Sequence, residues 1–245
     1  HLMGDDFIES DGGVHNIRVY QNRGVNAAHN GYSSQPVFGG PVYFFRNILY
    51  HVPGGSDFKL SADPAGILAY HNTLIREQTA TGPYGNAHFR NNLFMGRGST
   101  REGVMTWGNG TNDYSSDYNG YRPNPGVKKQ YDWRTPENPK GQSFATLAEF
   151  QKATGQEAHG VELDFDIFEN LAPDDPSPVK RYQVYHSMDL NFQLKAGSKA
   201  IDAGVVLPTI NDNFTGRAPD LGALEFGKPE PHYGPRWITW KPFYR

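Results

Sequence analysis

Four carboxylates stand close together near the start of the sequence. Asp5 and Asp6 are adjacent, and Glu9 and Asp11 follow them in the stretch MGDDFIESDGG, residues 3–13. Paired carboxylates can catalyse acid–base reactions, because one can protonate a leaving oxygen while another activates a water molecule. The two glycines that follow indicate a turn, and acids before such a turn are also common as solvated turn or strand-edge residues. The sequence leaves both interpretations open.

A histidine and a lysine follow the acids at intervals that suit a repeating fold. His29 lies 23 residues after Asp6, and Lys59 lies 30 residues after His29. In a fold of stacked coils, residues one coil apart in the sequence become neighbours in space. We therefore expect His29 and Lys59 to line one face of the first coils together with the acids.

A repeated asparagine indicates which fold holds these residues. Four segments share a strand-like apolar pattern, then asparagine, then further apolar residues: IRVYQNRGV (17–25), VYFFRNILY (42–50), ILAYHNTLI (67–75) and AHFRNNLF (87–94). Their aligned asparagines are Asn22, Asn47, Asn72 and Asn91, at spacings of 25, 25 and 19 residues, and Asn119 is a further candidate 28 residues on. The residues just before three of them are expected to point outward: Arg46, His71 and Arg90.

The repeat predicts a right-handed parallel β-helix. The segments lack the apolar spacing of a helix, and the two-residue turn signals of β-hairpins are missing between them. In a parallel β-helix each strand lies on the equivalent strand of the previous coil. An asparagine at the same turn of each coil can then form a hydrogen-bonded ladder that satisfies buried backbone groups. We predict such a ladder at Asn22, Asn47 and Asn72.

The repeat fades after about residue 122. We predict two parts of one continuous domain: β-helix coils in residues 1–125 and a C-terminal capping region in residues 126–245 that packs on them. The cap contains one short helix within residues 136–160. Phe144, Leu147 and Phe150 fall at helical spacing there, and Ser143 is the expected N-cap.

The C-terminal segment resembles the closing segment of many bacterial right-handed β-helix proteins. The matching stretches are LKAGSKAIDAG (194–204) and NDNFTGRAPDLGALE (211–225). This resemblance implies the fold and a C-terminal cap, and it implies no activity. Asp202, Asp212 and Asp220 stand beside glycines here, which indicates turn-forming acids, with a calcium site as the alternative.

The N-terminal part resembles the polygalacturonase-type glycoside hydrolases, which are right-handed β-helices. Their pattern Gly-Asp-Asp-x-Ile is followed by a histidine one coil later and a lysine on the next coil. Here these residues are Gly4-Asp5-Asp6-Phe7-Ile8, His29 and Lys59. The resemblance implies that one acid protonates the glycosidic oxygen and another activates water. It also implies that the histidine supports the acid and that the lysine binds a substrate carboxylate.

Three positions depart from the family pattern. The family histidine lies between two glycines, whereas His29 lies between Ala28 and Asn30. The family has an arginine two residues before the lysine, where this chain has Asp57. The family's third aspartate precedes the pair by one coil and has no counterpart here, so Glu9 or Asp11 would have to replace it.

These features favour a glycoside hydrolase that acts on an acidic polysaccharide by acid–base catalysis. The candidate catalytic residues are Asp5, Asp6, Glu9 and His29, and the candidate substrate-binding residues are Lys59, Asp11, His71 and Arg76. The proton-donating acid needs a raised pKa, which we expect from the crowding of the carboxylates, since like charges cannot all ionise at close range. No metal and no cofactor is expected.

Two other functions stay open. A polysaccharide lyase removes the proton beside a uronic carboxylate, so it needs a base and a cation that neutralises the carboxylate. Lys59, His29 or His71 would serve as the base, and Arg76 or Arg90 as the neutralising cation. In the second alternative, the chain is a carbohydrate-binding or structural β-helix without catalytic activity. Aromatic residues of the later segment would then stack on sugars, or pack the cap against the coils: Trp107, Tyr114, Tyr118, Tyr121 and Trp133.

The composition limits the partners. A net charge of −3 with 20% charged residues gives no basic footprint for nucleic acid, and no apolar stretch is long enough to span a membrane. The absence of cysteine excludes disulfides, zinc–thiolate sites and a cysteine nucleophile.

We expect a secreted or periplasmic protein whose signal peptide is not in this chain, with a polysaccharide or oligosaccharide as partner. Self-association, or N-terminal coils missing from this sequence, would cover the open edge at residues 6–10.

Overall fold

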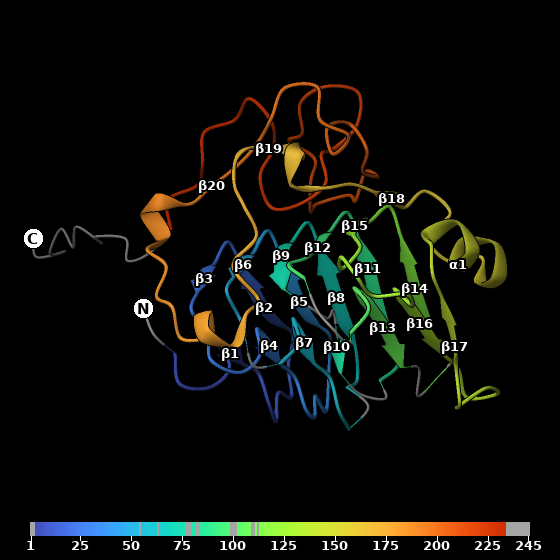
Figure 1. Cartoon of the computed structure of the whole chain (residues 1–245). Coiled ribbons are helices and arrows are strands. Elements are labelled where there is room, and N and C mark those ends of the chain that lie inside the picture. The colour runs from blue at the N-terminus through green and yellow to red at the C-terminus, as the bar shows by residue number, and fades with distance from the viewer. Residues whose placement is uncertain are drawn as a thin grey trace, which may run out of the picture.

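The computed structural model describes residues 3–53, 55–62, 64–76, 80–81, 84–98, 102–108, 111 and 113–233. This part of the chain is a parallel β-solenoid with one short α-helix (Figure 1). Four successive coils each contribute one strand to each of three parallel sheets. The predicted parallel β-helix architecture is therefore confirmed.

The three sheets run along the length of the solenoid. Sheet 1 consists of β1 (Ile8–Glu9), β4 (Tyr32–Ser33), β7 (Phe58–Lys59) and β10 (Ala80–Thr81). Sheet 2 consists of β2 (Ile17–Tyr20), β5 (Val42–Phe45), β8 (Ile67–Tyr70), β11 (Ala87–Arg90) and β14 (Tyr114–Asp117). Sheet 3 consists of β3 (Arg23–Val25), β6 (Ile48–Tyr50), β9 (Thr73–Arg76), β12 (Leu93–Gly96), β15 (Gly120–Arg122) and β18 (Val161–Glu162). In the described residues, β1, β2 and β3 are the edge strands at the N-terminal end.

The remaining strands and helices all follow β12 in the chain. β13 (Met105–Gly108) pairs in parallel with β16 (Tyr131–Arg134), and β17 (Gln142–Phe144) runs antiparallel to β16. β19 (Phe168–Asn170) and β20 (Asn191–Leu194) form a separate antiparallel pair. Three single-turn 3₁₀ helices span Phe165–Ile167, Pro178–Lys180 and Ser187–Asp189. The stacking of strands thus extends past residue 125, since β15 pairs with β18.

An asparagine ladder joins the coils at the turn between sheets 2 and 3. The backbone N–H and side-chain amide of each asparagine donate to Oδ1 of the next, at 2.8–3.1 Å. The rungs are Asn22, Asn47, Asn72, Asn92 and Asn119. The ladder predicted at Asn22, Asn47 and Asn72 is confirmed, and Asn119 also belongs to it.

The alignment of Asn91 with this ladder is wrong. The residue before each rung has a left-handed backbone: φ is +50° at Gln21, +53° at Arg46 and His71, +58° at Asn91 and +56° at Tyr118. This bend turns the chain from sheet 2 into sheet 3. Asn91 occupies the bend, and its neighbour Asn92 forms the rung. Asparagine tolerates the left-handed region better than most residues, which explains its place at the bend.

Aromatic and aliphatic side chains together fill the interior of the solenoid, and many of the aromatic rings contact one another. Phe44 lies 4.9 Å from Tyr32 and 5.4 Å from Phe58, measured between ring centroids. Trp107 is fully buried and lies 4.4 Å from Phe89. Tyr114 and Tyr121 are buried in the same core, and Trp133 packs on Phe150 at 5.7 Å, whereas Tyr118 stacks on His159 at 4.3 Å. Of the candidate sugar-stacking aromatics, Trp107, Tyr114 and Tyr121 therefore pack the core.

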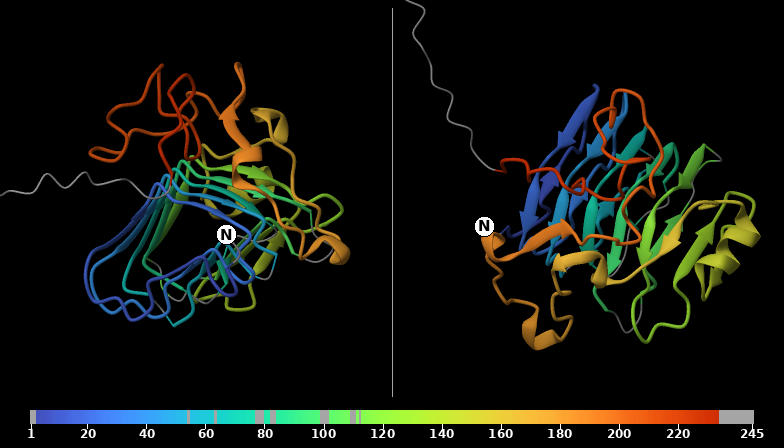
Figure 2. Two further views of the ribbon diagram at one scale, coloured as in Figure 1. Left: turned by 90° about the vertical axis from the view of Figure 1, so that its left-hand side faces the viewer. Right: turned by 90° about the horizontal axis from the view of Figure 1, so that it is seen from above.

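The C-terminal part covers one side and one end of the tube. Residues of the cap such as Phe192 and Leu224 pack on outward side chains of sheet 3, including Ile48 and Leu93. Figure 2 shows this segment, in orange to red, along one side of the solenoid. α1 (Leu147–Thr154) lies at the end opposite the N-terminus, where Phe150 is fully buried in the main core.

Side-chain hydrogen bonds to nearby backbone groups define the start of the short helix and the acidic turns of the C-terminal segment. The N-cap of α1 is Thr146, which forms a capping box with Glu149, so the expected cap at Ser143 is wrong. Ser143 instead lies in β17. The three acids predicted to form turns do so: Asp202 accepts from the backbone of Arg217, Asp212 from Thr209 and Asp220 from Phe226. No helix in the described part of the chain has the length and apolar character needed to cross a membrane.

Candidate functional site

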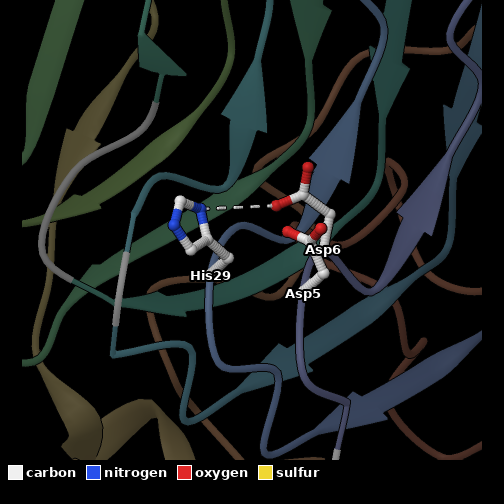
Figure 3. A group of neighbouring side chains, drawn as sticks. All are labelled: Asp5, Asp6 and His29. Atoms are coloured by element: carbon white, nitrogen blue, oxygen red, sulfur yellow. Dashed lines mark ion pairs between the residues drawn. The ribbon is translucent and has the colours of Figure 1, made fainter.

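The candidate site lies at the corner where the chain turns from sheet 3 into sheet 1. Asp5, Asp6 and His29 lie in this turn, and Lys59 lies in the neighbouring strand β7. We call these four residues the first corner. Ile8 of β1 pairs with Tyr32 of β4, so Asp5 and Asp6 occupy the same coil positions as His29 and Asn30. One ligand atom from each of Asp5, Asp6 and His29 lies within 4.8 Å of the others (Figure 3). Parallel stacking therefore brings residues 23 or 24 positions apart into one group.

Asp6 is the buried centre of the first corner. Its Oδ1 accepts hydrogen bonds from the backbone N–H of Asn30 at 2.9 Å and from the Asn30 side-chain amide at 2.7 Å. Oδ1 of Asn30 in turn accepts from the backbone N–H of Ser56 at 2.8 Å. Asp6, Asn30 and Ser56 thus form a second, shorter ladder. The structural interpretation of Asp6 has direct support here, since one of its oxygens stabilises the turn of the next coil.

The second oxygen of Asp6 faces a cation. Lys59 Nζ lies 3.3 Å from Oδ2 of Asp6, and His29 Nδ1 lies 3.8 Å from Oδ1. The Asp6 side chain has no exposed surface, whereas 61% of the His29 side chain and 29% of the Lys59 side chain are exposed. The corner therefore presents an imidazole and an ammonium group to solvent above a buried carboxylate.

The pKa of Asp6 moves in the opposite direction to the one expected from crowded carboxylates. Burial acts to raise the pKa of the Asp6 carboxyl, but hydrogen bonds from the side chain and backbone of Asn30, together with Lys59, outweigh it. The pKa of Asp6 is therefore lowered from its ordinary value. An ionised, buried carboxylate cannot donate a proton to a glycosidic oxygen, so Asp6 is suited to position its neighbours.

The other two acids of the first turn lie apart from this arrangement. Glu9 is exposed on β1. Asp11 accepts a hydrogen bond from the Ser33 hydroxyl at 2.8 Å and from the backbone N–H of Gln35 at 2.7 Å. Asp11 therefore stabilises the turn after β4, which agrees with the structural interpretation of this acid.

His71 lies elsewhere in the fold, beneath the C-terminal segment. It is fully buried, its Nδ1 lies 3.3 Å from the carbonyl oxygen of Gly222, and its Nε2 accepts from the amides of Asn91 and Asn211. Burial, followed by the charge of Arg46, lowers the pKa of His71 to about 3. The structure therefore does not bring His71 to the first corner, and its burial keeps it from a polysaccharide.

The two candidate arginines are also separate from the first corner. Arg76 is buried and donates to the carbonyl oxygen of Val52 at 2.7 Å. Arg90 lies on the outer face of sheet 2, where it donates to Ser115 Oγ at 2.9 Å. Asp57, which stands where the resembled family has arginine, is buried, and this burial raises its pKa well above the ordinary value although Arg76 opposes the shift.

Sequence reasoning missed two features of the site region. Asn30, which holds Asp6, was not singled out, although its spacing of 24 residues from Asp6 was a usable signal. A buried cluster of His51, Asp174 and Arg97 also escaped prediction, because Asp174 comes from the distant C-terminal segment. Asp174 Oδ2 lies 2.7 Å from His51 Nδ1 and also contacts Arg97.

Two clefts in the described part of the chain lie away from the first corner. One of about 580 Å³ lies between the C-terminal segment and the turn after β18, with Asp164, Asp166, Lys195 and Lys199 in its lining. Another of about 260 Å³ is lined by Arg46, Asp212 and neighbouring residues.

The donors of the first corner also fit a divalent cation. Asp5, Asp6 and His29 offer two carboxylates and an imidazole within one sphere. Lys59 stands 3.3 Å from the same Asp6 carboxylate, and its charge opposes a bound cation. Hydrogen bonding of Asp6 to Asn30 further occupies the oxygen that faces His29. Both features oppose a cation bound at this carboxylate.

Comparisons with known proteins assign no family. No protein-family model matches the chain, and no curated protein shows a significant match. The fold and the first corner together define a parallel β-solenoid with a candidate acid–base site.

Proposed function

We propose that the protein is a glycoside hydrolase that acts on an acidic polysaccharide at the first corner. Asp6 is the residue on which this proposal rests. Its buried carboxylate lies against His29 at 3.8 Å and Lys59 at 3.3 Å, and these two residues come from the next two coils. Such a cluster of an acid, an imidazole and an ammonium group on one exposed corner supports acid–base chemistry on a charged sugar polymer.

Each residue of the first corner has a role in this proposal. The ligand atoms of Asp5 and His29 lie within 4.8 Å of each other, a separation close to that of glycosidases that form a covalent glycosyl–enzyme intermediate. Protonated His29 donates its proton to the glycosidic oxygen while an Asp5 oxygen bonds to the sugar carbon and the glycosidic C–O bond breaks. Neutral His29 then takes a proton from a water whose oxygen bonds to the same carbon and releases Asp5, so one water is consumed for each bond cleaved. Asp6 positions His29 and Lys59, and Lys59 binds the substrate carboxylate.

β-Elimination is a second candidate, because the same corner presents an imidazole and an ammonium group to solvent. A lyase needs a base that removes the proton beside a uronic carboxylate and a cation that neutralises this carboxylate. Neutral His29 supplies the base and Lys59 the cation, so the reaction does not require a protonated carboxyl group. His71 and Arg76 have no part in this version because both are buried away from the corner.

A panel of polysaccharides tests the proposal. Pectins, alginate, xylans and arabinogalactans are incubated with the protein, and the products are read for new reducing ends and for the ultraviolet absorbance of an unsaturated sugar. Hydrolysis produces reducing ends without this absorbance, whereas elimination produces both. We expect activity on an acidic polymer, and His29→Gln and Lys59→Ala each reduce it by at least about 100-fold.

Matched exposed residues serve as controls. His15→Gln and Lys128→Ala change the same residue types on the exposed surface and should leave activity unchanged. Asp6→Asn tests positioning, because it should shift the pH profile of the reaction as well as lower its rate. Full activity of the His29 and Lys59 variants would overturn the assignment of the site. Absence of any product across the panel would leave the protein a carbohydrate-binding or structural solenoid and overturn the enzymatic proposal.

A further inference from the structure

The outer face of sheet 2 carries an unusual concentration of aromatic and cationic side chains. The second and fourth residues of each four-residue strand point outward, and the first and third are more buried. The register of the strands places these outward residues in two columns. One column is Arg18, Tyr43, Leu68, His88 and Ser115, and the other is Tyr20, Phe45, Tyr70, Arg90 and Asp117.

Four rings from the first three strands form the aromatic part of this face. Tyr20 and Phe45 stack with centroids 4.9 Å apart and planes 3° apart. The guanidinium of Arg18 lies 5.7 Å from the ring centroid of Tyr43. Tyr20 is 50% exposed, and Tyr43, Phe45 and Tyr70 are partly exposed. These rings therefore lie on the outer face of the sheet, partly exposed to solvent, and outside the core.

The charge of this face is positive where the rings lie. Arg18 flanks them on the first coil, and Arg90 lies one coil beyond Tyr70 in the same column. Burial lowers the pKa of His88 although Asp113, whose carboxylate lies 3.8 Å from His88 Nε2, opposes the shift. Arg18 and Arg90 are the cations of the face, and Asp113 adds a negative charge beside His88. The one acid among the ten outward residues, Asp117, stands at the far end and pairs with His159 at 2.9 Å.

Sheet 2 is also separate from the first corner. Within each coil the chain passes from the corner through sheet 1 before it reaches sheet 2. The cap contributes its apolar residues to sheet 3, as the second core cluster shows. In the described residues, the apolar cluster of the cap thus covers sheet 3, whereas the outer side chains of sheet 2 are partly or fully exposed.

We propose that the outer face of β2, β5, β8 and β11 is a second binding surface for an acidic oligosaccharide. Sugar rings pack against the exposed parts of Tyr20, Tyr43 and Tyr70, and Arg18 and Arg90 pair with sugar carboxylates. Neighbouring coils lie about 4.8 Å apart, so the columns present rings and charges at regular intervals along an extended chain. The class of ligand rests on the proposed function, whereas the surface rests on the geometry of sheet 2.

Titration calorimetry with defined sugars tests this surface. The probes are oligogalacturonate, its fully methyl-esterified neutral form and oligomannuronate. We expect an acidic oligomer to bind more tightly than the neutral form. Tyr43→Ala and Tyr20→Ala should each weaken binding about tenfold, the scale of one lost aromatic contact. Arg18→Gln and Arg90→Gln should weaken binding and reduce its dependence on salt.

Two controls separate this surface from the rest of the molecule. Tyr182→Ala removes a tyrosine that is 84% exposed on the cap, and Arg181→Gln removes an exposed arginine beside it. Both should leave binding unchanged. Far-ultraviolet circular dichroism and denaturant unfolding verify that the sheet 2 variants remain folded.

The outcomes distinguish this proposal from the proposed function. Binding that survives His29→Gln but is weakened by the sheet 2 variants supports the surface, whether or not the protein cleaves the sugar. Binding that is lost with His29→Gln and unaffected by the sheet 2 variants overturns the surface and leaves the first corner standing. A concentration-dependent dimer that Tyr43→Ala abolishes, without sugar binding, would assign the face to a second copy of the chain and also overturn the proposal.

Discussion

At the scale of single residues, Asp6 joins a structural and a candidate functional role in one carboxylate. Oδ1 holds the turn of the next coil through Asn30, and Oδ2 faces Lys59 two coils on. Buried ionised groups persist when hydrogen bonds and an opposite charge compensate for lost hydration. The contacts that keep Asp6 ionised also hold Lys59 against it, and Asn30, which donates to Asp6, lies 3.1 Å from His29 Nδ1 through the same amide.

The stability provided by Asp6 should depend on pH. Its pKa in the folded protein lies below the ordinary value of 3.8, so the folded state binds this proton less readily than the unfolded state. Its contribution is therefore present above the ordinary pKa and is lost as the pH falls through the lowered value. Asp6→Asn should lower the free energy of unfolding by about 1–3 kcal/mol at neutral pH, and by less near pH 3.

Urea denaturation at both pH values measures this difference. Asp189→Asn, a change at an exposed acid outside the corner, is the control and should alter stability little at either pH. A gap between wild type and Asp6→Asn that stays the same at both pH values would show that the ionised form of Asp6 does not stabilise the fold.

At the scale of elements, the asparagine ladder fixes the sharp bend between sheets 2 and 3. A middle rung both donates to the next asparagine and accepts from the previous one. Asn72 donates to Asn92 and accepts from Asn47, and all three are fully buried. Asn22 is half-buried and donates to Asn47, as the first rung of the series.

Position in the ladder should therefore decide the cost of removing a rung. Asn72→Ala leaves two buried donors of Asn47 without their acceptor, and should lower the free energy of unfolding by at least about 2 kcal/mol. Asn22→Ala leaves no other rung without an acceptor and should cost less than about 1 kcal/mol. Denaturant titration of both variants provides the comparison, and equal costs would argue against a cooperative ladder.

The ladder was predictable because a polar residue at a fixed turn recurs at intervals of about one coil. The misaligned rung was harder to avoid, because Asn91 and Asn92 are adjacent and both fit the pattern. The residue types at the left-handed bend give no guide, since they include Gln21, Arg46, His71 and Tyr118. Backbone conformation distinguishes the bend from the rung, and a single sequence does not reveal it at non-glycine positions.

At the scale of the whole molecule, a buried cluster attaches the C-terminal segment to the solenoid. Asp174 of this segment contacts His51 and Arg97, which follow strands β6 and β12. Tyr50 adds a hydrogen bond to the carbonyl oxygen of Ala172 at 3.1 Å. Removal of one partner from a buried charge cluster is usually costly, because the remaining charge loses its compensation.

Asp174→Ala should therefore destabilise the protein by about 3 kcal/mol or more. Asp175→Ala changes the neighbouring exposed acid and should cost less than about 1 kcal/mol. Thermal and denaturant unfolding of the two variants tests this contrast. Similar small effects in both would mean that apolar packing alone holds the segment in place.

The meeting of Asp5, Asp6, His29 and Lys59 was predictable from coil spacing, whereas their environments were not. Asp6 is buried because Asn30 hydrogen-bonds to it and because of the path of the turn. The types of the neighbouring residues do not predict this burial. The positions of His71 and Arg76 depend on contacts with the cap and on the solenoid interior. Contacts such as His51 with Asp174, separated by 123 residues, follow from tertiary packing and have no periodic signal.

The asparagine ladder also has a polarity. Every rung passes its donors toward the next coil, and the last asparagine, Asn119, donates to the carboxylate of Glu157. The Glu157 carboxylate can accept these hydrogen bonds, but it has no amide N–H that could donate to a further rung. The ladder therefore ends at Glu157. It also has a direction: a further asparagine rung would fit before Asn22, whose Oδ1 would accept its amide, whereas the Glu157 carboxylate offers no amide donor to a rung beyond it. Strand stacking alone continues past Glu157, through β18.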